Sequence, residues 1–197
     1  MDATGDLLDL SLREFLEQVA SEHPAPAGGS AAAFAVAMSA GLSAMVARAS
    51  TDWPEAAAMA AQAERLRKRT APLVQRDAEA YEEALVALRL PQGLEREVRD
   101  RAIGDVLGRA AEVPLELAAA GADAASLAAL IAERGTQERR GDAVAAALLA
   151  ESGARAAAAL VAINLTVRPG DERVEQAKAL AETARQAARD ALVSIES

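Results

Sequence analysis

The segment Pro24-Ala25-Pro26-Ala27-Gly28-Gly29-Ser30, which runs directly into the alanine-rich stretch 31–49, is the most informative part of the chain. Two prolines hold the backbone extended, two glycines permit tight turns, and Ser30 stands where a helix N-cap is expected. The stretch behind it consists almost entirely of Ala, Ser, Met, Val, Leu and Gly. This pattern predicts a glycine-rich loop that leads into a helix whose small side chains let neighbouring helices approach closely. The backbone N–H groups at such a helix N-terminus suit an anion or an oxyanion.

The composition of the whole chain favours the same kind of structure. Hydrophobic residues make up 52% of the 197 residues and aromatic residues only 2%, so alanine, the best helix former, supplies much of the apolar content. β-Branched residues are too scattered to form strands with a period of two. We therefore expect an all-α fold: an antiparallel bundle of about six or seven helices in a single domain over residues 1–197.

Caps and breakers predict where the helices begin and end. Ser11 and Glu14 form a capping box, Asp52–Glu55 is a second capping signature, and Asp142 is the expected cap of a buried helix. The helices are expected over residues 11–21, 30–50, 55–88 with a kink at Pro72, 94–120 with a kink or break at Pro114, 124–134, 142–164 and 171–197. Pro91 and Gly93 are expected to end the third helix, Gly121–Asp123 to interrupt the chain, and 135–141 to form a polar loop.

Charge and cysteine content narrow the classes of partner. The net charge of −9 argues against nucleic-acid binding, which needs a basic face, and the lack of cysteine excludes disulfides and thiolate metal sites. The N-terminus has no signal-peptide pattern, so we expect a cytoplasmic protein. The apolar stretches 31–47 and 143–165 are expected to be buried helices, not membrane spans. Because helices this rich in alanine bury little apolar area each, a homodimer is also expected.

The side chains able to carry chemistry are few. His23 is the single histidine, which excludes sites with two histidine ligands, and a loop histidine of this kind is more often solvated than catalytic. The two lysines lie on polar helix faces, and no P-loop or dinucleotide fingerprint is present. Asp77 lies in the middle of a helix, where it is either a solvated charge or a functional carboxylate. Asn164 ends an apolar helix, where it either holds backbone groups or meets a ligand.

These features occur in an order that resembles the cyclodeaminase/methenyltetrahydrofolate cyclohydrolase family. The resemblance covers about residues 12–195. It is carried by Phe15-Leu16, Pro26-Ala-Gly-Gly-Ser30 with its alanine-rich helix, Met45-Val46, Asp77-Ala-Glu-Ala-Tyr81, Leu90-Pro91, Ala111-Glu-Val-Pro-Leu115, Gly141-Asp142 and Ile163-Asn-Leu165. The glycine loop with its alanine-rich helix is fairly specific, and the other pieces are loose but collinear.

The resemblance implies an all-α dimer that acts on a reduced folate at the one-carbon unit bridging N5 and N10. It implies that Asp77 is the general acid/base, that the reaction needs no metal and no cofactor beyond the tetrahydrofolate substrate, and that six residues bind this substrate. These six are Pro26, Gly28, Gly29, Ser30, Asp142 and Asn164. Both family reactions, ring opening by a cyclohydrolase and ring closure with loss of ammonia by a cyclodeaminase, would use these groups.

Two alternatives remain open, because the chain departs from the family pattern. Ala27 replaces the first glycine of the usual loop, Gly135-Thr136 and Gly141-Asp142 replace a Gly-Asn and a Ser-Asp pair, and Gln75 occupies an often acidic position. One alternative is a non-catalytic dimer of the same fold that binds folate or a protein. The other is a purely structural dimer whose glycine loop is only a turn.

Overall fold

The computed structural model describes residues 5–89 and 96–195, and all regular structure within these ranges is helical. This confirms the expected all-α class. The α-helices are α1 (Leu12–Val19), α2 (Gly28–Ala49), α3 (Ala56–Thr70), α4 (Leu73–Leu88), α5 (Arg96–Ala110), α6 (Glu112–Arg134), α7 (Arg140–Asn164) and α8 (Glu172–Val193). Two short 3₁₀ turns, Leu7–Asp9 and Gln137–Arg139, precede α1 and α7.

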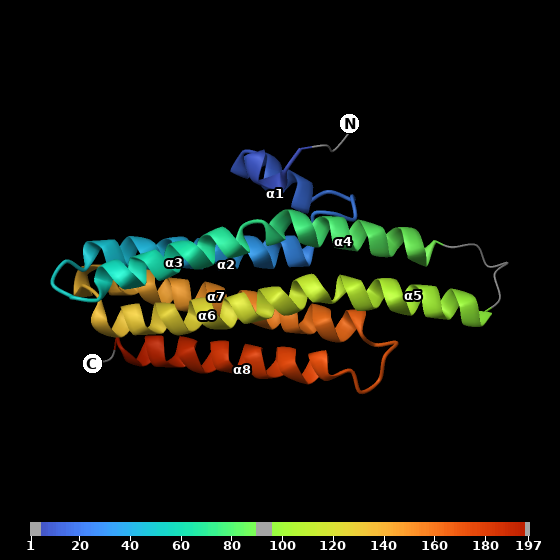
Figure 1. Cartoon of the computed structure of the whole chain (residues 1–197). Coiled ribbons are helices and arrows are strands. Elements are labelled where there is room, and N and C mark those ends of the chain that lie inside the picture. The colour runs from blue at the N-terminus through green and yellow to red at the C-terminus, as the bar shows by residue number, and fades with distance from the viewer. Residues whose placement is uncertain (1–4, 90–95, 196–197) are drawn as a thin grey trace.

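Two pairs of these helices form interrupted rods. The α3–α4 pair breaks at Pro72, as the sequence predicts, and α5 continues into α6 with a break at Ala111 (Figure 1). Counted as rods, the described helices number six, within the expected six or seven. The expected end at Pro91 and Gly93 lies outside the described residues.

The interruption predicted at Gly121–Asp123 is wrong, because α6 runs through it without a break. Gly121 serves helix packing instead: a Cβ there would lie 2.9 Å from the Cβ of Ala154 and 3.1 Å from the carbonyl oxygen of Ala150 on α7. The kink or break predicted at Pro114 is present, because the α5–α6 rod is interrupted at Ala111, three residues before this proline. Pro114 itself is the third residue of α6, where a helix tolerates the missing N–H.

The capping predictions had mixed outcomes. Ser11 and Glu14 form the predicted capping box of α1. The prediction that Asp52–Glu55 caps the next helix is wrong, because α3 begins after Glu55 and has no side-chain cap. Asp142 is also not a cap: α7 begins at Arg140 and places Asp142 in its first turn. Ser30 is not the N-cap of α2 but its third residue, and the flanking position belongs to Ala27, whose side chain makes no capping hydrogen bond.

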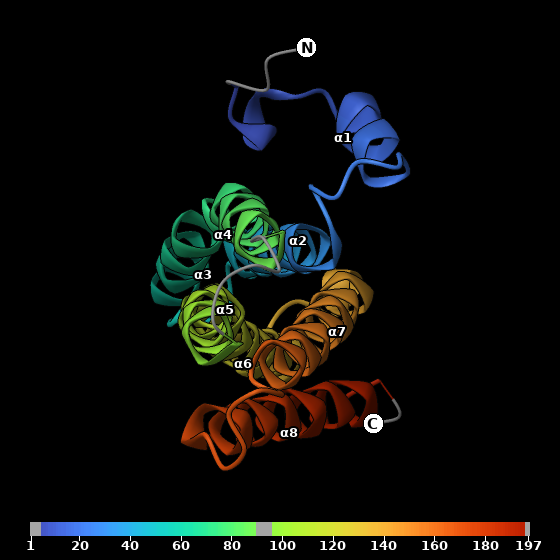
Figure 2. The same ribbon diagram turned by 90° about the vertical axis from the view of Figure 1, so that its right-hand side faces the viewer.

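The rods lie side by side in layers. One layer holds α2, α3 and α4, the next holds α5, α6 and α7, and α8 covers the far side of α6 and α7 (Figures 1 and 2). The short helix α1 lies on the opposite side of the bundle, where the ring of Phe15 meets that of Phe34 on α2 at a centroid distance of 5.3 Å. The core is mostly alanine, with a few larger fully buried side chains such as Leu73, Leu117 and Ile131.

Close helix contacts depend on glycine where α2 crosses α7. A Cβ at Gly153 would overlap the side chain of Val36 and lie 3.1 Å from the carbonyl oxygen of Ala32. Residues this small at the crossing let the two backbones approach, which brings the N-terminus of α2 beside the C-terminal half of α7. The crossing therefore positions two of the elements that surround the candidate site.

Gly153→Ala is expected to lower the free energy of unfolding by about 1–3 kcal/mol, the usual cost of overpacking a tight contact. Gly104 in α5 is the matched control, because a Cβ there meets nothing within 4 Å. Gly104→Ala is expected to raise the free energy of unfolding by about 0.5–1 kcal/mol through helix propensity. Denaturant unfolding of both variants measures the contrast, and equal effects would contradict the close crossing.

Three helical stretches are long and apolar enough to cross a membrane by length and composition: Gly28–Ala49, Val98–Arg134 and Gln137–Asn164. In the folded chain 61%, 61% and 44% of their apolar windows are buried. The first agrees with the expectation that residues 31–47 form a buried helix, and the third, which contains most of the expected buried stretch 143–165, leaves more than half of its window uncovered. That the protein is cytoplasmic, outside the membrane and without a nucleic-acid partner stays a prediction.

Candidate active site

A cavity of about 240 Å³ lies where four parts of the bundle meet: the N-terminus of α2, the middle of α4, the α5–α6 junction and the C-terminal end of α7. Its walls are mostly apolar, and its polar groups are the Asp77 carboxyl, the Tyr81 hydroxyl, the Asn164 amide and the backbone of the glycine loop. The lining residues are Ala27, Gly28, Gly29, Asp77, Ala80, Tyr81, Ala110, Pro114, Leu160, Ile163 and Asn164. An apolar pocket with a few convergent polar groups is the usual form of a small-molecule site.

Asp77 reaches from α4 to the N-terminus of α2. Its side chain is only 8% exposed, and its carboxyl group occupies the space that a Cβ of Gly29 would need. Only glycine at position 29 lets the carboxyl group come this close to the first turn of α2. Because Ala27 provides no side-chain cap, Asp77 supplies from another helix the acidic group that this helix end lacks.

Ser30 is buried next to Asp77 and connects α2 to α4. Its hydroxyl oxygen lies 2.8 Å from the carbonyl oxygen of Val74 and 3.3 Å from Oδ2 of Asp77. Ser30 does not line the cavity itself, so its contact with the site passes through Asp77. The prediction that Ser30 caps α2 failed because the helix begins two residues earlier, which turns its hydroxyl toward α4.

Burial raises the pKa of Asp77 above the ordinary value for aspartic acid, and hydrogen bonding with the Ser30 side chain and backbone N–H opposes this rise. Burial disfavours the charged form because the carboxylate loses water and no basic side chain lines the cavity. A carboxyl group with a raised pKa in a small pocket is a candidate for proton transfer.

The raised pKa of Asp77 predicts a pH-dependent stability difference. The neutral form is favoured in the folded state, so its stabilising contribution is complete below the unfolded pKa of about 3.9 and is lost as the pH rises through the folded pKa. Asp77→Asn removes that loss. We expect the free energy of unfolding of Asp77→Asn to rise relative to wild type between pH 3.5 and pH 7. A pH-independent difference in denaturant unfolding would contradict the raised pKa.

Asn164 is held at the cavity by an effect of Pro114. In a helix the carbonyl oxygen of Ala110 would accept the N–H of residue 114, but proline has none. The free Ala110 carbonyl accepts a hydrogen bond from Nδ2 of Asn164 at 3.1 Å instead. This bond joins the end of α7 to the α5–α6 junction and fixes the amide, whose oxygen atom remains able to accept a hydrogen bond from a ligand.

The structure brings four of the predicted site residues together in the cavity wall, namely Gly28, Gly29, Asp77 and Asn164, with Ser30 behind Asp77. Pro26 is buried in the preceding loop but does not line the cavity. Asp142 lies 22 residues before Asn164 on the same helix, which is about 33 Å at 1.5 Å per residue. Within one chain Asp142 is therefore not part of this site, and its role as a substrate ligand stays a prediction.

Other lining residues were missed by the sequence reasoning. Tyr81 lies one turn after Asp77 on α4 and is 41% exposed, and Pro114, Leu160 and Ile163 complete the apolar wall. The four-residue spacing of Asp77 and Tyr81 was a usable signal, since it puts both side chains on one helix face. Ile163 belongs to a motif that carries the family resemblance but was not assigned to the site, and Leu160 gave no signal, because its place in the cavity depends on how α7 packs.

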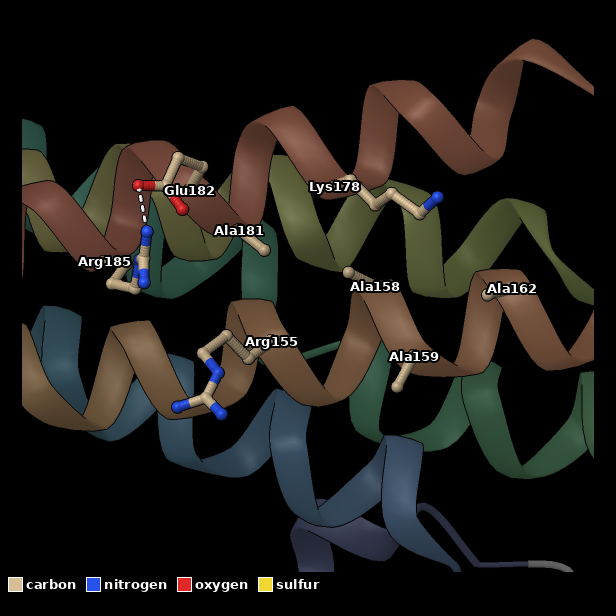
Figure 3. A pocket seen from close by; sticks show the side chains of 8 residues that line it. All are labelled: Arg155, Ala158, Ala159, Ala162, Lys178, Ala181, Glu182 and Arg185. Carbon is tan, nitrogen blue, oxygen red and sulfur yellow. Dashed lines mark hydrogen bonds and ion pairs between the residues drawn. The ribbon is translucent and has the colours of Figure 1, made fainter.

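The second groove, His23 and metal binding have less support as alternatives to the Asp77 cavity. A second groove, of about 500 Å³, runs between α7 and α8 and is lined by Arg155, Lys178, Arg185, Glu182 and alanines (Figure 3). It contains none of the predicted site residues, and its Arg185 pairs with Glu182 at 2.6 Å. His23 is exposed and does not line the Asp77 cavity. Over residues 5–89 and 96–195, no group of three or more His, Asp or Glu side chains is arranged to hold a metal ion.

The fold and the cavity together define an all-α protein with a small, mostly apolar cavity that holds a buried carboxyl group. Comparison with known proteins agrees with this class. The chain matches the formiminotransferase-cyclodeaminase family over residues 11–189, and it belongs to that family. It is 32% identical to the methenyltetrahydrofolate cyclohydrolase of Methylorubrum extorquens over 163 residues, which covers 78% of each chain.

Two further similarities extend the comparison. The chain is 35% identical over 121 residues to the formimidoyltransferase-cyclodeaminase of Rattus norvegicus, which covers 57% of this chain but only 22% of that longer protein. The crystal structure of formiminotetrahydrofolate cyclodeaminase from Thermotoga maritima superimposes with a TM-score of 0.81 at 26% identity, over 98% of this chain and 100% of that one. The family resemblance inferred from the sequence motifs is therefore confirmed.

Proposed function

We propose that this protein is a folate one-carbon enzyme that acts at the unit bridging N5 and N10 of tetrahydrofolate, as a methenyltetrahydrofolate cyclohydrolase or a formimidoyltetrahydrofolate cyclodeaminase. The observation that carries the proposal is the buried Asp77 carboxyl group, which faces a mostly apolar cavity at the N-terminus of α2. The names of the relatives supply the substrate class, and the cavity supplies the groups that the chemistry needs.

Both reactions pass through a tetrahedral carbon and require proton transfers. In the cyclohydrolase reaction water adds to the methenyl carbon and the bond to N5 breaks; one water proton goes to N5 and the other to solvent. In the cyclodeaminase reaction N10 attacks the formimino carbon, N10 loses its proton, and the former imino nitrogen leaves as ammonia after gaining protons. A single carboxyl group in the position of Asp77 can take and return these protons, so the proposal invokes no metal and no further cofactor.

The glycine loop and Asn164 would hold the substrate around this carbon. Free N–H groups in the first turn of α2 favour a developing negative charge, and the Asn164 amide is fixed by Ala110. The replacement of glycine by Ala27 is compatible with this role, because Ala27 has an extended conformation with φ of −124°. Two other departures lie at the N-terminal end of α7, away from the cavity: Thr136 precedes this helix and Gly141 is its second residue. The last, Gln75 on α4, accepts a hydrogen bond from the Leu7 N–H and does not line the cavity.

Absorbance of 5,10-methenyltetrahydrofolate tests the proposal with both substrates. Starting from methenyltetrahydrofolate, the absorbance is expected to decay faster with protein than without; starting from 5-formiminotetrahydrofolate, it is expected to appear together with ammonia. The faster of the two identifies the preferred reaction. If neither rate rises above the uncatalysed one while calorimetry shows folate binding, the non-catalytic folate-binding alternative is correct.

We also propose that the protein is a homodimer that pairs through the outer face of α7. Besides Gly141 and Arg155, which pairs with Glu151, the exposed residues of this helix are small or apolar and recur at spacings of three and four: Ala145, Leu148, Ser152, Ala156, Ala159 and Ile163. The helix packs against α2, α6 and α8, and in Figure 2 its remaining side has no covering helix. Because the 18-residue apolar window within Gln137–Asn164 is only 44% buried in one chain, a second copy would cover the remainder.

Ala156→Glu is expected to dissociate this dimer, because it puts a charge at the centre of the apolar face. Ala57→Glu on the exposed side of α3 is the matched control and is expected to leave the dimer intact. Light scattering after gel filtration measures both. A wild-type monomer, or a dimer that survives Ala156→Glu unchanged, would contradict the proposed interface.

A further inference from the structure

The hydroxyl group of Ser30 has more oxygen neighbours than it has protons. Its Oγ lies 2.8 Å from the carbonyl oxygen of Val74 and 3.3 Å from Oδ2 of Asp77. A carbonyl oxygen can only accept, so the short contact with Val74 requires that Ser30 donates its single proton there. The hydroxyl oxygen then has only lone pairs to offer Asp77.

The reverse assignment, in which Ser30 donates its proton to Asp77, leaves a buried contact without a hydrogen bond. If Ser30 donated to Asp77, the 2.8 Å contact between Ser30 and Val74 would join two oxygens with no proton between them. Val74 and Ser30 are both fully buried, so water cannot relieve that contact. A neutral carboxyl group, in contrast, carries an O–H donor. Both contacts are satisfied at once when Asp77 Oδ2–H donates to Ser30 and Ser30 donates to Val74.

The surroundings of Asp77 favour a neutral carboxyl group. Of the elements around the cavity, α4 contributes Tyr81 as a titratable group, and the lining residues of α2, α5, α6 and α7 carry no charge. The cations next to the lining residues in sequence are paired: Arg76, which precedes Asp77, pairs with Glu116, and Arg109, which precedes Ala110, pairs with Glu83, each at 2.8 Å. Two influences would favour the carboxylate instead. One is a hydrogen bond donated by the Ser30 hydroxyl, whose single proton the short contact with Val74 already takes. The other is the backbone N–H of Ser30 in the first turn of α2.

We propose that Ser30 is a positioning residue which accepts the proton of neutral Asp77 and, through its own bond to Val74, keeps that proton on Oδ2. This assigns Ser30 a role other than contact with the substrate. The link Asp77–Ser30–Val74 holds the acid in one orientation and one protonation geometry before a ligand enters. Its importance for turnover rests on the proposed folate function, whereas the proton arrangement itself does not.

The carboxyl ¹³C signal of Asp77, assigned by its loss in Asp77→Asn, tests this arrangement in a pH titration without any ligand. Ser30→Ala removes the acceptor of the neutral acid, so the apparent pKa of Asp77 is expected to fall by roughly half a pH unit to one pH unit. Ser30→Thr keeps the hydroxyl group and is expected to restore the wild-type value. Ser39→Ala is the matched control: Ser39 is also fully buried on α2, and its hydroxyl has no hydrogen-bond partner in the described structure.

The direction of the shift decides the outcome. A rise in the apparent pKa of Asp77 in Ser30→Ala would show that Ser30 donates to the carboxylate, and an unchanged value would show no coupling; either result overturns the proposal. Ser30→Cys, which keeps the side-chain size but is a weak acceptor, gives the same test if Ser30→Ala does not fold. If turnover is absent but the fall occurs, the folate function fails and this inference stands.

Discussion

Asp77→Asn is expected to lower kcat for the preferred folate reaction by roughly 10²–10⁴-fold, the usual contribution of a positioned general acid or base. Asparagine has nearly the same shape and can still accept a hydrogen bond at the N-terminus of α2, but it cannot take up or release a proton. The loss should appear in kcat more than in KM, because the missing proton transfer belongs to the transition state.

Asp190→Asn is the control for this experiment, since Asp190 is exposed on α8 and lies outside the cavity. It is expected to leave both kinetic constants unchanged. Circular dichroism should show that Asp77→Asn remains folded. A folded Asp77→Asn protein with wild-type kcat would remove Asp77 from the chemistry and with it the proposed mechanism.

Gly29→Ala is expected to have the second-largest effect, a loss of roughly 10²-fold in kcat/KM. A Cβ at position 29 would occupy the space of the Asp77 carboxyl group, so either that group or the first turn of α2 must move. A displacement of about 1 Å at a catalytic group costs on the order of 10²-fold in rate.

Gly28→Ala is the matched control, one residue away in the same turn. A Cβ at Gly28 meets nothing within 4 Å and does not displace Asp77, so this substitution is expected to leave kcat nearly unchanged. Because Gly28 lines the cavity, its effect is expected in KM. Steady-state kinetics of the two variants, measured beside each other, separates the steric effect on Asp77 from a general need for glycine in the loop. Equal losses would contradict the close packing of Asp77 on Gly29.

Composition and breakers were sufficient to predict most of the fold. Alanine abundance and the absence of strand patterns indicated a helical bundle, and Pro72 marked the break between α3 and α4 correctly. The interpretation of Gly121 was wrong, because the sequence alone does not show whether a glycine ends a helix or allows a close contact with a neighbouring helix. Only the packing of α6 on α7 shows that Gly121 is needed to avoid Ala154.

The sequence predicted most residues of the candidate site but not the contacts between them. The motifs identified Asp77, the glycine loop and Asn164, which line one cavity. Local capping rules could not show that Asp77 contacts the N-terminus of α2, because Asp77 and Ser30 are 47 residues apart in sequence and meet only in the folded chain. In the sequence Pro114 indicates only a kink or break, whereas in the structure it also leaves the Ala110 carbonyl free to accept a hydrogen bond from Asn164.

The most direct test of the account is to titrate 5-formyltetrahydrofolate, a stable reduced folate, into the protein while recording its NMR spectrum. The account predicts saturable shifts of the Asp77 carboxyl and Asn164 amide signals, with the signals of Lys178 and Arg185 in the α7–α8 groove unaffected. Saturable binding that shifts the groove signals and leaves Asp77 and Asn164 unchanged, or no binding at all, would contradict the claim that the Asp77 cavity is the reduced-folate site.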